Sequence, residues 1–376
     1  MSLHTIAAYE PLPTLSRWQP TGRESGHRDP LSIRMKKAMH KSEQSYTHAG
    51  CDTSKDTIDM VRSTDDERTN HRRFANTHAG HQRLIQWLTG PGQAVRVVVE
   101  ASGIYSLDLA LALHQTDGID VMVANPRALK DYRRAHMQRS KTDKVDATII
   151  CDYARRMPFV PWQPPSSEVL ELQQIARRIQ ALVVERTREK NRLRTACATV
   201  TSSPLVINDI EVNIRHLDRR IAELEKQALK RVAASESIKQ THRHLTSVPG
   251  ISHRSAVQLL AEILVLPRGL SVREWVAFAG LDVRRYESGT SVERPRRISR
   301  VGNVRLRRAL YMPALVAIRC DESIGAFYKK LISKGKKPMV AIVAVMRKLL
   351  HAIYGMLKHD ADFDGSKFYR IPVKAD

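Results

Sequence analysis

Cysteine is scarce in this sequence: there are four in 376 residues, and no two of them form a C-x-x-C pair. This scarcity argues against a zinc ribbon and a disulfide framework, and it predicts a reducing, cytoplasmic location. The sequence also lacks any run of about 18 uncharged apolar residues and any N-terminal apolar segment of the signal-peptide kind. We therefore expect a protein that is neither exported nor held in a membrane.

Acidic residues are few relative to basic ones. The 62 Lys and Arg residues outnumber the 39 Asp and Glu residues, so that the formal net charge is +23. A charge of this size predicts a polyanionic partner, and nucleic acid is the leading candidate, although a merely basic or ribosome-associated protein would share the composition. Hydrophobic residues make up 42% of the chain. This share indicates a folded core, and the length favours two or three domains.

The N-terminal half divides into two predicted segments. Residues 1–45 show no hydrophobic period and are predicted to be a disordered basic arm, although translation from an upstream start codon would also account for them. Residues 46–160 alternate short β-type runs with helical stretches, which indicates an α/β domain with a central sheet. The apolar residues 97–99 predict a strand that is buried on both faces. The β-type runs are 57–61, 95–99 and 119–124, and the helical stretches are 72–88, 104–115, 126–137 and 143–156.

The rest of the chain is predicted to be largely helical. Residues 166–235 place apolar side chains at alternating spacings of three and four, which indicates coiled-coil helices in a hairpin or between subunits; an ordinary helical pair fits equally well. Residues 240–360 form a predicted third domain with a helix-hairpin-helix-like turn at Gly250, which could meet a DNA phosphate or serve as a packing joint. Its residues 338–357 predict a buried core helix. Residues 361–376 are predicted to be a tail.

Four carboxylates of the α/β region stand where strands end or helices begin. Asp52 follows a short apolar run, Glu100 ends the Val-rich strand, and Asp143 and Asp146 stand three residues apart at a helix start. An i, i+3 pair places both carboxylates on one helix face, where they can reach acids at neighbouring strand ends. Clustered carboxylates suit Mg²⁺, and two such ions can hold the attacking and leaving oxygens of a phosphodiester. Taken singly, each acid is better explained as a solvated charge or a helix cap.

Two ordered sets of motifs run along the chain. The first set is Gly50–Lys55, Glu100–Tyr105, Asn125–Pro126 and Arg139–Ala147, and the second is Val248–Ile251, Phe278–Leu281, Glu287–Gly289, Ile298–Asn303 and Leu306–Arg308. In order and spacing, these motifs resemble the DEDD transposases of the insertion-sequence-110 group of bacterial mobile elements, together with the related pilin-gene invertases. The resemblance covers residues 47–358.

This resemblance implies a fold and a mechanism. It implies an α/β RuvC-like domain of the RNase H type, a coiled-coil middle and a mostly α C-terminal transposase domain. It implies Mg²⁺ as the cofactor, with Asp52, Glu100, Asp143 and Asp146 as its ligands and as catalytic residues. By motif position it implies Ser288 as the nucleophile that forms a phosphoserine bond to DNA. The implied partners are element ends, target DNA, an element-encoded guide RNA and further copies of the chain, as a dimer or a synaptic tetramer.

The surroundings of Ser288 favour phosphate binding on physical grounds as well. Residues 268–308 contain eleven arginines, four acids and no lysine, and Gly289 permits close backbone approach to a phosphate. No Ser-His-Asp motif accompanies Ser288, so deprotonation assisted by the acid site is expected. Without the resemblance, a plain turn explains the Ser-Gly pair better. The residues predicted to bind nucleic acid are Gly250, Arg284, Arg285, Arg294, Arg296, Arg297, Arg300, Arg307 and Arg308.

We therefore interpret the sequence as a transposase or site-specific DNA recombinase that works through a phosphoserine intermediate. A Holliday-junction or structure-selective nuclease is the runner-up, in which the same four acids activate water and no serine adduct forms. The third interpretation is a nucleic-acid binder without enzymatic activity on the same fold. A trapped protein–DNA adduct distinguishes the first from the second, and metal-dependent cleavage distinguishes the second from the third.

Overall fold

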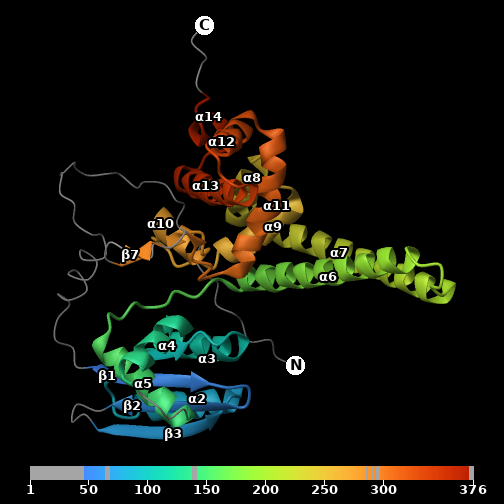
Figure 1. Cartoon of the computed structure of the whole chain (residues 1–376). Coiled ribbons are helices and arrows are strands. Elements are labelled where there is room, and N and C mark those ends of the chain that lie inside the picture. Colours follow the sequence, from blue (N-terminus) through green and yellow to red (C-terminus); the bar gives the residue numbers. More distant parts are fainter. Residues whose placement is uncertain are drawn as a thin grey trace. The chain divides into compact units, whose positions relative to one another are not determined.

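The computed structural model of the chain describes residues 46–63, 68–137, 142–284, 287–288, 292–293 and 297–371 (Figure 1). It divides into two compact units, Met1–Pro161 and Trp162–Asp376. The predicted N-terminal arm, residues 1–45, lies outside the described residues. Each unit is described by itself below.

A mixed five-stranded sheet forms the centre of the first unit, with the strand order β3-β2-β1-β4-β5. The pairs β1–β2 and β2–β3 are antiparallel, whereas β1–β4 and β4–β5 are parallel. A parallel pair needs a crossover connection, and helix α3 supplies it between β4 and β5. The strands are β1 (Tyr46–Thr53), β2 (Thr57–Ser63), β3 (Thr69–Ala75), β4 (Ala94–Glu100) and β5 (Ile119–Ala124).

Four described helices accompany this sheet. Helix α5 lies across β1, β2 and β4, and α4 packs on α5. Val98 of β4 packs with residues of α4 and α5, whereas Val97 and Val99 point to the opposite face of the sheet and are fully buried too. Helices α2 and α3 also contact β4. The predicted strand with two buried faces is therefore confirmed. The helices are α2 (His78–Thr89), α3 (Ile104–His114), α4 (Pro126–Ala135) and α5 (Asp143–Arg156).

The helix predicted at residues 72–88 begins later than expected. Strand β3 extends to Ala75, and α2 starts at His78 after Thr77, whose hydroxyl accepts a hydrogen bond from the Gly80 amide. The sequence of β3 has no apolar alternation, because it is an edge strand in which only Phe74 is buried. Its pairing with β2 along seven residues, from Thr57 to Ser63, fixes the strand, so that tertiary hydrogen bonding overrides the local pattern.

Two long helices begin the second unit and form a hairpin (Figure 1). They are α6 (Ser167–Cys197) and α7 (Pro204–Ala234), and Ser166 caps α6 by accepting a hydrogen bond from the Val169 amide. Their apolar stripes are buried in the core of the same chain. Leu172, Ile179 and Leu182 come from α6, and Leu217 and Ile221 come from α7. The structure thus shows two helices that form a hairpin and pack on their own chain, as the hairpin and the ordinary helical pair both predict, whereas a coiled coil and a seam between subunits remain predictions.

The remaining helices share one hydrophobic core with this hairpin. Helix α13 is long and apolar enough by composition to cross a membrane, yet Val345, Leu349 and Ile353 pack into that core, which confirms the predicted core helix. Residues 361–371 contain α14, whose Phe368 is buried there as well. The helices are α8 (Glu236–Ser247), α9 (His253–Ile263), α10 (Val272–Phe278), α11 (Val304–Cys320), α12 (Glu322–Ser333), α13 (Pro338–His359) and α14 (Gly365–Phe368).

Candidate active site

Asp52 and Glu100 stand at the same edge of the sheet. Strands β1 and β4 are parallel neighbours whose last registered pair is Cys51 with Val99, so Asp52 and Glu100 come next on the two strands. Neighbouring strands lie about 4.8 Å apart, and residues in register point to the same face. The fold therefore brings together two acids that are 48 positions apart in the sequence.

Gly50 determines which element covers these acids. A Cβ atom at Gly50 would come within 2.1 Å of the Cys151 backbone nitrogen and 2.5 Å of the Ala147 carbonyl oxygen, both of which belong to α5. Only a residue without a side chain allows α5 to lie this close to β1. Asp52 is two residues further along the strand, so its side chain points to the same, α5-covered face.

The first turn of α5 carries the other two acids. Thr142 caps the helix, because its hydroxyl accepts a hydrogen bond from the Val145 amide at 3.2 Å. Asp143 and Asp146 follow in that first turn. Asp146 is almost completely buried, whereas the side chain of Asp143 is 60% exposed. A carboxylate at this end of a helix is also stabilised by the helix dipole.

The electrostatics connect the other three acids with Asp52. The pKa of Asp52 is raised from its ordinary value of 3.8 to about 6. Burial is the largest cause, and repulsion by Asp146, Glu100, Asp143 and Asp59 follows in that order. The structure thus brings together all four acids that the sequence singled out. It leaves a concentration of negative charge that a cation would relieve.

Asp59 and three basic residues complete this site, and the sequence analysis missed them. Asp59 is buried on β2 directly opposite Asp52 in the antiparallel register. The Arg73 guanidinium joins Asp59 at 3.0 Å to Asp143 at 3.2 Å, and the His71 ring lies 2.7 Å from Asp59. Arg133 of α4 pairs with Asp146 at 2.9 Å. A charged residue between Ile58 and Met60 in an apolar strand was the available signal for Asp59.

The donor set suits a divalent metal in chemistry and charge. Hard cations such as Mg²⁺ prefer carboxylate oxygens, and the negative charges of the other three acids contribute to the raised pKa of Asp52. In the described part of the chain, however, no three His, Cys, Asp or Glu residues surround a common point as they stand. Arg73 and Arg133 hold Asp143 and Asp146 instead. Because the carboxylates do not converge as they stand, ligation of one metal by all four acids would require movement of their side chains.

Ser288 lies in the second unit, in a small hairpin between α10 and α11. Its strand β7 (Glu287–Ser288) pairs with β8 (Val292–Glu293), with Ser288 opposite Val292. A second pair, β6 (Val283–Arg284) with β9 (Arg297–Ile298), precedes and follows it in the chain.

The predicted nucleic-acid-binding residues differ in their surroundings. Arg284, Arg297, Arg300 and Arg308 are exposed. Arg307 is half-buried and donates a hydrogen bond to the Ala279 carbonyl oxygen at 2.8 Å. Gly250 has a φ of 94°, and a Cβ atom there would come within 2.7 Å of the Ala317 backbone nitrogen. Its turn is therefore packed against α11. Arg285, Arg294 and Arg296 lie outside the described residues.

The contact between Gly50 and α5 yields a first prediction. We expect Gly50→Ala to destabilise the first unit by about 1–3 kcal/mol, because the added methyl group meets the backbone of α5 rather than a flexible side chain. Thermal unfolding followed by circular dichroism measures this loss. Gly355→Ala is the matched control, since it adds a methyl group to α13 where no atom lies within 4 Å. Equal melting temperatures for Gly50→Ala and the wild type would refute the packing argument.

Two family models match the chain one after the other. A DEDD IS110 transposase model matches residues 49–200, which include all four acids. A model of the IS116/IS110/IS902 transposase family matches residues 242–329, which include Ser288. The matches therefore extend over parts of both units.

Curated proteins are similar to the chain over nearly their whole length. The pilin gene-inverting proteins of Moraxella lacunata and Moraxella bovis are each 28% identical over 331 residues, which cover 85% of this chain and 98% of each relative. The uncharacterized 42 kDa protein of insertion element IS900 from Mycobacterium paratuberculosis is 25% identical, over 83% of this chain and 96% of its own length.

Proposed function

Because the chain belongs to the IS110 family of DEDD transposases, which are enzymes acting on DNA, we propose that it is a recombinase that exchanges DNA strands through a phosphoserine intermediate on Ser288. The names of its relatives support this reaction class, since two of them invert a gene and another belongs to an insertion element. The proposed substrates are the two ends of a mobile element and its target DNA.

The gathering of four carboxylates at one edge of the sheet is the observation that carries the metal-dependent part of this proposal. The serine step is supported by the family match that includes Ser288. Repulsion by the other acids contributes to the raised pKa of Asp52, which residues scattered over a surface would not produce. The strand order, with three antiparallel strands followed by two parallel ones, supports a RuvC-like fold of the RNase H type. Both features belong to the same unit.

We propose that Asp52, Glu100, Asp143 and Asp146 hold Mg²⁺. When bound, the metal would polarise the scissile phosphate and neutralise charge that builds up on its oxygens. The acids of β1 and β4 stand on a rigid sheet, so they fix the position of the site. The two acids of α5 pair with Arg73 and Arg133, which keep the carboxylates oriented and partly neutralised until a cation or a phosphate arrives.

Ser288 would perform the covalent step. Its hydroxyl oxygen forms a bond to phosphorus, the bond from phosphorus to a deoxyribose oxygen breaks, and in net terms the hydroxyl proton passes to that leaving oxygen. The number of phosphoester bonds is unchanged. Rejoining to a new strand therefore reverses the same chemistry and needs no external energy source.

We further propose that the enzyme works as a homo-oligomer with a guide RNA. The net charge of +23 supports binding of more than one polyanion. Val200, Leu205 and Val206 are exposed at the closed end of the α6–α7 hairpin, and exposed apolar residues support contact with a second copy.

A second candidate function uses only the first unit. All four acids belong to that unit, so a structure-selective nuclease that activates water would need no residue from the second one. The two functions differ in their product. Strand exchange through serine leaves a protein–DNA adduct on an interrupted substrate, whereas hydrolysis leaves none.

Removal of metal tests the proposal directly. A plasmid that carries the DNA flanking this gene in its host is incubated with the purified protein, and recombinant junctions are amplified and quantified. We expect junctions with Mg²⁺ and at least about a hundredfold fewer after chelation with EDTA, because the phosphate then faces unrelieved carboxylates. Restored activity on adding excess Mg²⁺ is the control. Equal yield in EDTA would contradict the metal assignment.

A further inference from the structure

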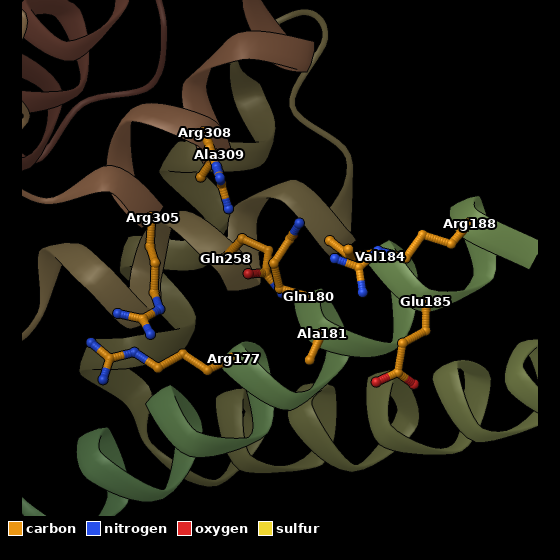
Figure 2. A pocket seen from close by; sticks show the side chains of 10 residues that line it. All are labelled: Arg177, Gln180, Ala181, Val184, Glu185, Arg188, Gln258, Arg305, Arg308 and Ala309. Atoms are coloured by element: carbon orange, nitrogen blue, oxygen red, sulfur yellow. The ribbon is translucent and has the colours of Figure 1, made fainter. Parts of the chain in front are cut away.

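A pocket of about 300 Å³ lies in the second unit between helices α6, α9 and α11 (Figure 2). Four arginines line it, although the two pairs are far apart in the sequence. Arg177 and Arg188 belong to α6, and Arg305 and Arg308 belong to the first two turns of α11. Figure 2 shows the side chains of Arg177 and Arg305 converging at one end of the pocket.

A buried acid holds one of these arginines in place. Glu262 of α9 is 2% exposed, and its carboxylate accepts hydrogen bonds from Arg177 at 2.9 and 3.2 Å. It also accepts one from the Asn303 side chain at 2.6 Å, directly before α11. Gln258 donates to the Ala176 carbonyl oxygen at 2.7 Å and so ties α9 to α6. These contacts fix the walls of the pocket before any ligand arrives.

The other three arginines keep their charge available. Within the described chain, Arg188, Arg305 and Arg308 have no carboxylate partner, and Glu185 is the one acid among the residues that line the pocket. Arg305 and Arg308 also lie at the N-terminal end of a 17-residue helix, where the helix dipole adds partial positive charge. The pocket is therefore a preformed site for anions with an excess of guanidinium groups, which suit phosphate geometry.

We propose that this pocket binds phosphates of the DNA backbone. Arg177 and Arg188 are eleven residues apart on α6, which separates them by about 16 Å along the helix axis at 1.5 Å per residue. A single phosphate-sized ion could contact the arginines at only one end of this span, whereas successive phosphates of a DNA strand could contact the arginines at both ends. The identification of DNA as the ligand rests on the proposed function, and the positive site itself does not. The sequence analysis noted the many arginines near Ser288 but did not find this pocket, because two of the four arginines that line the pocket belong to the distant helix α6.

Paired substitutions of exposed, unpaired arginines test this site. Arg188→Gln combined with Arg305→Gln removes two charges and leaves the Arg177–Glu262 pair intact. Binding of the full-length variant to a labelled DNA duplex of arbitrary sequence is measured by fluorescence anisotropy over a range of KCl concentrations. Two lost phosphate contacts should reduce the slope of log affinity against log salt by about 1.8 and weaken binding about tenfold or more near 0.1 M KCl.

The matched control changes the net charge by the same amount elsewhere on α6. Arg178→Gln combined with Arg194→Gln alters exposed arginines that do not line the pocket, and we expect the wild-type slope. An unchanged slope in the pocket variant, or an equal fall in both variants, would overturn the proposal. A fall for an RNA duplex but not for DNA would also overturn it and assign the pocket to RNA.

Melting temperatures show that each variant is folded before its affinity is interpreted. Adduct formation by the wild-type protein is measured separately. If the pocket variant binds DNA more weakly but the wild-type protein forms no adduct, the pocket proposal stands and the serine mechanism is rejected. Failure of the pocket proposal and failure of the proposed function are therefore distinguishable.

Discussion

Ser288→Ala is expected to abolish both the covalent protein–DNA adduct and the recombinant product. The substitution removes the one oxygen that would carry the phosphoryl group and adds neither bulk nor charge, so DNA binding should persist. A substrate with a nick next to the cleavage site traps the wild-type adduct, which is then seen as a denaturation-resistant shift on a gel. We expect the adduct to fall by at least about a thousandfold, because nothing replaces the nucleophile.

Ser291→Ala is the matched control for this experiment. Ser291 lies three residues further on, outside the Ser-Gly pair that the family motif contains, and its loss should leave at least partial activity. Mass spectrometry of the digested adduct then locates the modified residue. A nucleotide attached to Ser291 or Tyr286 would overturn the assignment to Ser288 and leave the recombinase class standing. Cleavage by Ser288→Ala at the wild-type rate would favour the hydrolytic nuclease.

Asp143→Asn should eliminate strand exchange while the protein remains folded. The side chain is 60% exposed and its partner Arg73 is 55% exposed. An ion pair at such a surface stabilises a protein by only about 0–1 kcal/mol, so the melting temperature should change little. Recombination activity should fall by more than about a hundredfold, because mutation of residues that only orient metal ligands already lowers metal affinity or activity by about 10–100-fold.

Asp146→Asn extends this test to the buried partner of Arg133. Asparagine keeps the shape of the side chain, but the negative charge that balances Arg133 is lost, so some loss of stability accompanies the loss of activity. Asp117→Asn, on an exposed loop after α3, is the matched control and should recombine normally. Wild-type recombination by Asp143→Asn in Mg²⁺ would refute the acid site, whatever the outcome for Asp146→Asn.

The local sequence was sufficient to find most elements of the first unit. Helices α3, α4 and α5 begin at the predicted residues, and the starts of α4 and α5 carry local signals, namely Pro126 after Asn125 and the cap at Thr142. Strand β3 was mistaken for part of a helix. Its polar residues carry no period, and what makes it a strand is the neighbouring strand β2.

The sequence by itself singled out the four acids and Ser288 and indicated a polyanionic partner, because residue type, order and charge are properties of the chain. Only the tertiary structure decided what surrounds them. The register of β1 and β2 places Asp59 opposite Asp52. The lack of a side chain at Gly50 allows α5 to pack against β1 on the face that carries both acids. The arginines of α6 lie beside those of α11 only because the two helices, which are more than a hundred residues apart in the sequence, pack into one core. Such contacts depend on packing between distant segments, which no local pattern encodes.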